Sequence, residues 1–227
     1  MKITKKENTK ETWSNEDNKQ YYENIPIEIF DKYTITGGFE NGCDVDVIYN
    51  NYLRNAASII DVGAGYGRVI KHLLDRGYSG KLMAIERSKN FYCSLYKKFS
   101  GRAKLFNCSV EDFKETKIAN VALCMWSMLS EWPKDKQVEI LKHITTFCKP
   151  GGIVILENIS HLITPKNVNV YEQKLYKAKT EYGILCGYIA STEEINYYAK
   201  AIGITKTKHI TYITLTGRER IIHVLWV

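Results

Sequence analysis

Three glycines, Gly63, Gly65 and Gly67, stand at every second position directly after an apolar run in the stretch IIDVGAGYGRVIKHLLDRG, residues 59–77. The run before them has the composition of a buried strand. The run after them has helical periodicity and places four apolar residues on one face: Val69, Ile70, Leu73 and Leu74. Glycines at a strand-to-helix turn let a ligand lie against bare N–H groups at the positive end of the helix. The stretch therefore predicts a nucleotide- or nucleoside-binding turn.

Alternating strands and helices are predicted along most of the chain. Apolar runs predict strands at 57–62, 81–86, 103–109, 119–127 and 152–160. Ser88 is placed to cap a helix that ends at Phe99, and Pro133 to begin another. Residues 191–203, with a capping box of Ser191 and Glu194, predict a helix, and a β-hairpin around TGRE follows it. This order predicts an α/β fold with a doubly wound, mostly parallel sheet.

Composition excludes several classes of protein. With 44% hydrophobic and 25% charged residues, the 227 residues suit one well-packed globular domain and argue against disorder. The chain has no run of about 18 apolar residues and no signal-peptide pattern at its start, so we expect a cytoplasmic protein without membrane contact. The net charge is +7 without a basic, aromatic-interleaved strip, which disfavours a nucleic-acid partner.

Six cysteines occur without a CxxC pair: Cys43, Cys93, Cys108, Cys124, Cys148 and Cys186. We interpret them as buried free thiols, and we expect no metal site.

The spacing of the glycines separates two kinds of nucleotide site. A dinucleotide fingerprint needs G-x-G-x-x-G, whereas here the third glycine comes one residue early and Arg68 follows it. The pattern D-x-G-x-G-x-G, with Asp61 ending the first strand and Glu86 ending the second, resembles the signature of class I S-adenosylmethionine-dependent methyltransferases. NCSVEDF after the third strand, KPGG before the fifth and the terminal helix and hairpin extend the resemblance over residues 56–227.

The resemblance implies a seven-stranded Rossmann-like sheet with a C-terminal antiparallel hairpin and S-adenosylmethionine (SAM) as cofactor, with S-adenosylhomocysteine as product. It implies that Glu86 accepts hydrogen bonds from both ribose hydroxyls, and that Ser109 and Val110 meet the adenine. The cofactor residues that it implies are Asp61, Gly63, Ala64, Gly65, Arg68, Glu86, Arg87, Ser109, Val110, Met125 and Trp126.

A narrower, gapped similarity links the chain to the protein α-N-terminal methyltransferases. It is carried by YYENIP, GGFENGCDVDV, MWSMLSEW, ILENIS and IHVLW. In that family an aromatic pair and a Trp wall the pocket and an Asn hydrogen-bonds the reacting amine, and the matching residues here are Tyr21, Tyr22, Trp126 and Asn158. The chain has Ser130 where the family has His, and Glu181 and Tyr182 where the family has Asp.

An amine nucleophile must lose a proton at neutral pH, and the candidate acceptors are Glu181, His161, Glu157 and water. The expected acceptor is an amine, with a peptide or protein N-terminus as the first class to try. A small molecule methylated on nitrogen or oxygen is the main alternative. An RNA methyltransferase and a catalytically silent scaffold rank lower.

We expect a single methyltransferase domain with four parts. These are an N-terminal cap or lid over 1–55, a SAM-binding core over 56–160, an acceptor-pocket insertion over 161–190, and a C-terminal helix and hairpin over 191–227. The cap and the insertion fit no regular α/β unit, and both flank the carboxyl edge of the strands, where open α/β sheets bind ligands.

Overall fold

The computed structural model describes residues 15–160, 168–171 and 174–227. Its main sheet has seven strands in the order β3-β2-β1-β4-β5-β10-β9. Five of them run parallel: β1 (Ser58–Val62), β2 (Lys81–Ile85), β3 (Ala103–Phe106), β4 (Ala119–Cys124) and β5 (Cys148–Ile159). The last pair is β9 (Thr207–Ile213) and β10 (Glu219–Trp226), and β10 is antiparallel to both β5 and β9. The predicted fold class and its C-terminal hairpin are confirmed.

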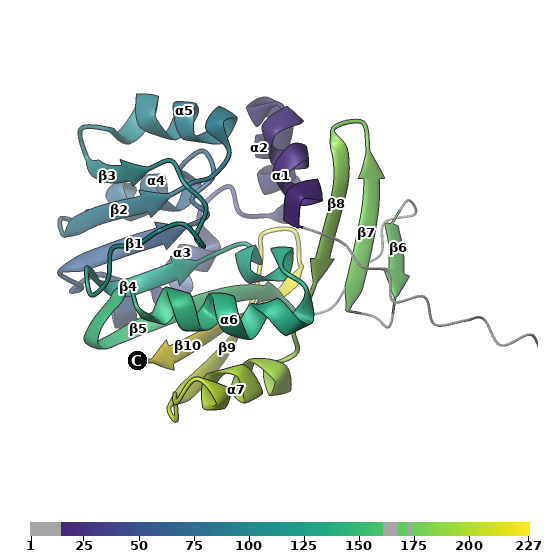
Figure 1. Cartoon of the computed structure of the whole chain (residues 1–227). Coiled ribbons are helices and arrows are strands. Elements are labelled where there is room, and N and C mark those ends of the chain that lie inside the picture. The colour runs from purple at the N-terminus through teal and green to yellow at the C-terminus, as the bar shows by residue number, and fades with distance from the viewer. Residues whose placement is uncertain (1–14, 161–167, 172–173) are drawn as a thin grey trace, which may run out of the picture.

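Helices cover both faces of the main sheet (Figure 1). On one face lie α6 (Lys134–Thr145) and α7 (Thr192–Ala201), and on the other lie α3 (Cys43–Ile48), α4 (Arg68–Asp75) and α5 (Lys89–Phe99). Two buried apolar cores fill the space between the sheet and these layers. Burial on both faces explains why the parallel strands are continuous apolar runs in the sequence.

Three predicted helix starts are present. The Ser88 hydroxyl accepts a hydrogen bond from the Phe91 N–H at the start of α5, and Pro133 directly precedes α6. Ser191 and Glu194 form the capping box of α7. These local signals satisfy backbone groups that have no partner within the helix, which is why they mark helix ends so reliably.

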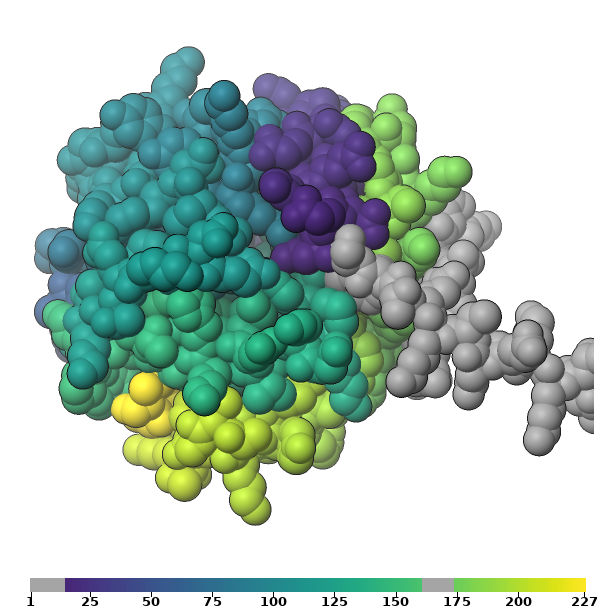
Figure 2. Space-filling view, in the orientation of Figure 1, coloured from purple at the N-terminus to yellow at the C-terminus, as the bar shows by residue number. Residues whose placement is uncertain are grey.

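The N-terminal segment forms helices above the carboxyl ends of the strands. They are α1 (Asn15–Asn24) and α2 (Ile27–Gly37), and a short π-helix over Tyr49–Leu53 follows α3. In Figure 2, α1 and α2 occupy the surface between the first half of the sheet and the hairpin of β7 and β8. The segment before residue 15 lies outside the described residues.

Residues 161–190, for which the sequence predicted no regular unit, contain a second sheet. It consists of β6 (Val168–Tyr171), β7 (Leu175–Thr180) and β8 (Gly183–Tyr188), paired antiparallel in that order. Two strands of the main sheet are also shorter than predicted. β3 ends at Phe106, and β4 ends at Cys124 because Trp126 and Ser127 take left-handed backbone angles.

The cysteines differ in burial. All six are free thiols, but Cys93 is exposed and Cys43 and Cys108 are half-buried, so the expectation of buried thiols is wrong for Cys93. α5 is amphipathic and turns the Cys93 position to solvent. No helix in the described part of the chain combines the length and the apolar character that crossing a membrane requires.

Candidate cofactor and acceptor site

A pocket lies at the carboxyl ends of β1, β2 and β4, beneath α1 and α2, and measures about 850 Å³ when the part open to solvent is counted. Its floor is the glycine turn. Gly63, Gly65 and Gly67 have φ values of 72°, 58° and 92°, and a Cβ placed on Gly65 would find no atom within 4 Å. The backbone at Gly65 therefore faces free space, as a ligand cradle requires.

Glu86 stands beside this turn with its carboxylate fixed at both oxygens. One oxygen accepts from the Gly65 N–H and the other from the Ser88 N–H, each at 2.7 Å. The residue is 6% exposed, and burial raises the pKa of its carboxyl to about 7 although the two N–H groups lower it. The carboxylate is thus held in one orientation, with further lone pairs available to a diol.

Asp61, the last acid of β1, is buried and incompletely bonded. It is 2% exposed, and its Oδ2 has no hydrogen-bond partner. Burial raises the pKa of the Asp61 carboxyl to about 7, and the Arg68 guanidinium partly opposes this rise. A buried carboxylate oxygen without a partner is expensive in a native protein. It marks a place where a cationic ligand group would be stabilised.

Arg68 lines the pocket but is already paired. Its guanidinium makes two hydrogen bonds to the Asp44 carboxylate, at 2.9 and 2.6 Å, and both residues are buried. The Asp44 carboxyl keeps a pKa below its usual value, because the ion pair with Arg68 outweighs the effect of burial. The guanidinium also lies 5.2 Å from the centre of the Phe39 ring and 5.9 Å from that of Trp126.

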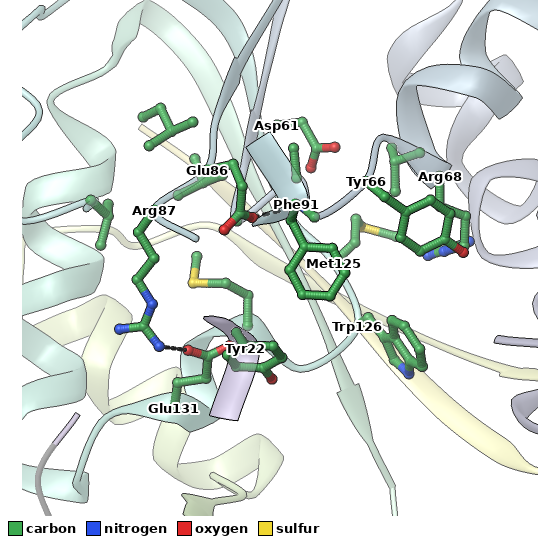
Figure 3. A pocket seen from close by; sticks show the side chains of 18 of the residues that line it. Tyr22, Asp61, Tyr66, Arg68, Glu86, Arg87, Phe91, Met125, Trp126 and Glu131 are labelled. Carbon is green, nitrogen blue, oxygen red and sulfur yellow. Dashed lines mark hydrogen bonds and ion pairs between the residues drawn. The ribbon is translucent and has the colours of Figure 1, made fainter. Parts of the chain in front are cut away.

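Arg87 and Glu131 meet across the opposite end of the pocket. The Arg87 guanidinium donates to the Glu131 carboxylate at 2.7 Å (Figure 3). It also donates to the Asn15 side chain on α1 at 2.7 Å. Burial raises the pKa of the Glu131 carboxyl, and Arg87 lowers it. This ion pair joins the end of β2 to the 3-10 helix over Met128–Glu131 and to the helix above.

The predicted adenine turn is only partly placed at the pocket. Val110 is buried and lines the pocket together with Cys108. Ser109 does not line it: its hydroxyl donates to the Asp112 carboxylate at 2.9 Å and accepts from the Asp112 N–H. The Ser109 side chain therefore stabilises the turn itself and lies outside the pocket lining.

Aromatic side chains form the wall opposite the carboxylates, and we call them the aromatic wall: Tyr22, Phe30, Phe91 and Trp126. The Phe30 ring centre lies 4.9 Å from those of Phe91 and Trp126 and 5.8 Å from that of Tyr22. In Figure 3, Tyr22 and Trp126 lie on the opposite side of the pocket from Asp61 and Glu86. Tyr21 is buried behind this wall, does not line the pocket, and packs edge-on against Tyr22.

The expected catalytic residues are not gathered at the pocket. Asn158 is 2% exposed on β5, does not line the pocket, and its Oδ1 has no hydrogen-bond partner. Glu181 is exposed at the turn between β7 and β8. Glu157 is buried in an ion pair with Arg220. His161 lies outside the described residues.

Several lining residues escaped the sequence analysis, among them Phe30, Phe91, Glu131 and Trp132. Phe30 is on α2 and comes from a segment without a motif. Glu131 lies in the run MWSMLSEW. Because this run forms a turn and a 3-10 helix, the Glu131 carboxylate points toward Arg87. An acidic residue four positions after the predicted strand 119–127 was the available signal, because that strand was expected to end at the ligand edge.

A model of the methyltransferase domain matches residues 59–152, which contain the glycine turn, Glu86, Val110 and Trp126. This match and the seven-stranded fold together support a class I S-adenosylmethionine-dependent methyltransferase. No curated protein matches the chain at a significant level.

Solved structures share the fold of this methyltransferase at low sequence identity. One is a 1,6-didemethyltoxoflavin-N1-methyltransferase from Burkholderia thailandensis, with 13% identity, a TM-score of 0.66, and 95% of this chain and 91% of that chain covered. A SAM-dependent methyltransferase from Leishmania major has 14% identity and a TM-score of 0.68, covering 93% and 82%. An amino pentose methyltransferase from Micromonospora echinaspora has 14% identity and a TM-score of 0.60, covering 88% and 97%.

The residues of the pocket suit SAM as the cofactor. SAM carries two positive groups, a ribose diol and an adenine. The pocket offers the unpartnered Asp61 Oδ2, the fixed Glu86 carboxylate and the open backbone at Gly65. Cys108 and Val110 also line the pocket and offer apolar atoms to a flat ring.

Proposed function

We propose that the enzyme methylates an amine of a small molecule that is held between the aromatic wall and the SAM methyl group. The observation that carries this proposal is the combination of aromatic rings with unpaired carboxylates. Both arginines of the pocket are already paired, with Asp44 and Glu131, whereas Asp61 and Glu86 have no ion-pair partner. Ring faces and excess negative charge both favour cationic groups, such as a sulfonium and an ammonium.

In this proposal each side chain has a positioning task. The Asp61 carboxylate holds the ammonium of the SAM methionine tail, and Glu86 holds the ribose hydroxyls. The N–H groups of Arg68 that Asp44 leaves free face the SAM carboxylate. SAM, when bound, supplies a methyl group that a nucleophile attacks in line with the bond to the positively charged sulfur, and the neutral sulfide is the leaving group. Holding two reactants in attack geometry contributes roughly 7–11 kcal/mol in well-oriented cases.

The enclosure of the pocket favours a small acceptor. α1 is fixed above it at several points: Asn18 bonds to backbone groups of β8 and of Glu131, and the Glu23 carboxylate accepts from the first N–H groups of α5. An extended peptide needs an open groove, whereas a metabolite fits a covered chamber. We also propose that the insertion over 161–190, which contacts α1 through β8, shapes the acceptor end. Two structural neighbours are named as enzymes that methylate small molecules.

No histidine lines the pocket among the described residues, and Glu181 is exposed away from it. Among the lining carboxylates, Glu131 is the one that this proposal does not assign to SAM, and burial raises the pKa of its carboxyl. We propose that the amine enters uncharged or passes its proton to Glu131 or water. Replacing Glu131 by Gln should then lower turnover most above the pKa of this carboxyl, where the wild-type carboxylate is ionised and can take the proton.

A peptide or protein N-terminus is the second candidate, and one observation favours it. The Asn158 Oδ1, at the position that matches the amine-binding Asn of the protein α-N-terminal methyltransferases, is buried without a partner. An amine donor would satisfy it if the acceptor passed beyond the 3-10 helix toward β5.

A methyl-transfer screen distinguishes the two candidates. Purified enzyme and radiolabelled SAM are incubated with a panel of small amines, matching alcohols and X-Pro-Lys peptides. We expect transfer to members of the amine panel, with the Trp126→Ala variant inactive. Transfer to peptides alone would replace the small-molecule proposal by the second candidate. Transfer to alcohols alone would refute the amine.

A further inference from the structure

The chain reverses direction directly after β4 in a turn made of two left-handed residues. Trp126 has a φ of 54° and Ser127 a φ of 60°, and the Met128 N–H donates to the Met125 carbonyl at 3.3 Å. Lys117 is the one other non-glycine residue with a positive φ in the described ranges. A left-handed residue with a Cβ costs about 1–2 kcal/mol, and such strain persists where the surroundings impose it. The turn therefore needs an outside support.

Arg220 and Glu157 supply this support. The Ser127 N–H donates to the Glu157 carbonyl at 2.9 Å, and Arg220 Nη2 donates to the Ser127 hydroxyl at 3.2 Å. The same guanidinium bonds to both Glu157 carboxylate oxygens, at 2.5 and 2.8 Å, and the Tyr212 hydroxyl donates to one of them at 2.8 Å. We call Arg220, Glu157 and Tyr212 the clamp.

Burial makes the clamp rigid. Arg220 is 5% exposed and Glu157 1%, so water does not compete for these bonds. Burying an ion pair rarely adds stability, because removing two charges from water offsets the attraction between them. A gain in stability therefore explains the presence of this ion pair poorly. Its bonds to the backbone and hydroxyl of Ser127 instead indicate that it fixes the geometry of the turn.

The clamp also reaches the pocket through packed rings. The Arg220 guanidinium lies 5.1 Å from the Phe39 ring centre, and Arg68, which lines the pocket, lies 5.2 Å from the same ring. The Trp126 ring centre is 5.7 Å from that of Phe39. Trp126 is therefore fixed from behind by Phe39 and at its backbone by the clamp.

We propose that Arg220 and Glu157 are positioning residues for methyl transfer, which hold the Trp126–Ser127 turn left-handed so that Trp126 stands in the wall of the acceptor site. The inference rests on the proposed function for the place of the acceptor beside Trp126. It removes Glu157 from the candidate proton acceptors, because its carboxylate oxygens are bonded to Arg220 and Tyr212. The clamp residues touch neither cofactor nor acceptor and act through Ser127.

The Arg220→Lys variant tests this proposal. Lysine keeps the positive charge beside Glu157 but lacks the planar fork that reaches Glu157 and Ser127 together. In protein labelled with 5-fluorotryptophan, the fluorine resonance of Trp126, identified by its loss in Trp126→Phe, should shift or broaden while that of Trp226 stays in place. Turnover should fall at least about tenfold, because misplacing the reactants by about an ångström is enough to cause such a loss. The affinity for SAM should stay within about threefold of the wild-type value.

Two matched comparisons make the result specific. The Arg218→Lys variant, two residues earlier and exposed, should keep the Trp126 resonance and full turnover. If Arg220→Lys does not fold, Ser127→Gly removes the hydroxyl while glycine tolerates the turn, and Lys117→Gly is its control at a remote positive φ. Ser127→Gly should also shift Trp126 and reduce turnover.

An unchanged Trp126 resonance with normal turnover in Arg220→Lys or Ser127→Gly would overturn the clamp. A loss of turnover with an unchanged resonance would overturn it as well, because the effect would then bypass Trp126. Failure of the wild-type enzyme to methylate any amine would refute the proposed function instead, and the fluorine spectra would still decide the positioning role.

Discussion

Acid should weaken SAM binding through Asp61 and Glu86. Both carboxyls line the pocket, and burial raises the pKa of each to about 7 from ordinary values of 3.8 and 4.5. In the proposed complex both are ionised, since Asp61 faces an ammonium group and Glu86 accepts from two hydroxyls. Protons and SAM therefore compete for the same two groups.

The size of the effect follows from these pKa values. Two pH units below a pKa of about 7, ionising one carboxyl costs about 2.7 kcal/mol, at 1.36 kcal/mol per unit. The dissociation constant of SAM should then rise roughly 50- to 100-fold per carboxyl between about pH 7 and about pH 5. A surface carboxyl with an ordinary pKa changes little over the same interval.

Isothermal titration calorimetry of SAM across this pH range measures the effect. Glu86→Gln should remove one of the two pH-dependent steps and cost about 1.5–3 kcal/mol of binding at alkaline pH, the value of a hydrogen bond to a charged group. Asp61→Asn should remove the other step. Asp75→Asn, which changes an exposed acid on α4, is the matched control and should bind SAM normally.

A dissociation constant that stays flat between about pH 8 and about pH 5 would refute the reasoning. Unchanged affinity in Glu86→Gln would remove the ribose assignment. In the absence of SAM, these two carboxyls should affect the stability of the fold in the opposite direction. Because the pKa of each is raised, the folded state binds more protons than the unfolded state between about pH 4 and about pH 7. Their contribution to the free energy of unfolding therefore increases as the pH falls. The difference in melting temperature between wild type and Asp61→Asn isolates that contribution.

Three further predictions concern single sites. Gly65→Val should abolish SAM binding in calorimetry while the protein stays folded by circular dichroism, because its methyls enter the cavity and valine at a φ of 58° is strained by about 1–3 kcal/mol. Trp126→Ala should reduce turnover far more than SAM affinity, and a matching loss in Asn158→Ala would support the peptide candidate; normal methylation by both would refute the acceptor assignment. His223 is buried against His209, at 2.8 Å between their Nδ1 atoms, and burial lowers the pKa of His223 to about 3. The contribution of His223 to stability should thus fall below about pH 6.5, by about 2 kcal/mol at about pH 5, and the difference in free energy of unfolding between wild type and His223→Leu in urea titrations isolates this contribution.

The sequence predicted the elements that depend on local signals. The capping box of Ser191 and Glu194, the cap at Ser88 and the hairpin around TGRE are short-range patterns, and each lies where it was expected. The mostly parallel character of the main sheet followed from the alternation of strands and helices. The glycine turn was predictable because its backbone angles demand glycine.

Features that depend on tertiary contacts were not predictable. The run ANVALCMWS was expected to be a strand to its end, but Arg220, which is distant in sequence, holds Ser127 in the turn that ends it. Ser109 bonds to Asp112 in the structure, a choice of partner that the motif does not reveal. The three strands between 168 and 188 carry no clear alternation, and their pairing with each other and contact with α1 define them.

The carboxamide of Asn18 forms hydrogen bonds with both backbone groups of Cys186, at 2.8 and 2.9 Å, as a neighbouring strand would. One helical side chain thus closes the free edge of β8 at that point and blocks further strand addition there. The small sheet therefore depends on α1 to cover this edge. The insertion of a relative could be grafted onto this core to change the choice of acceptor. Such a graft would need its own N-terminal helix, because a helix without this amide would leave the edge of the grafted sheet open.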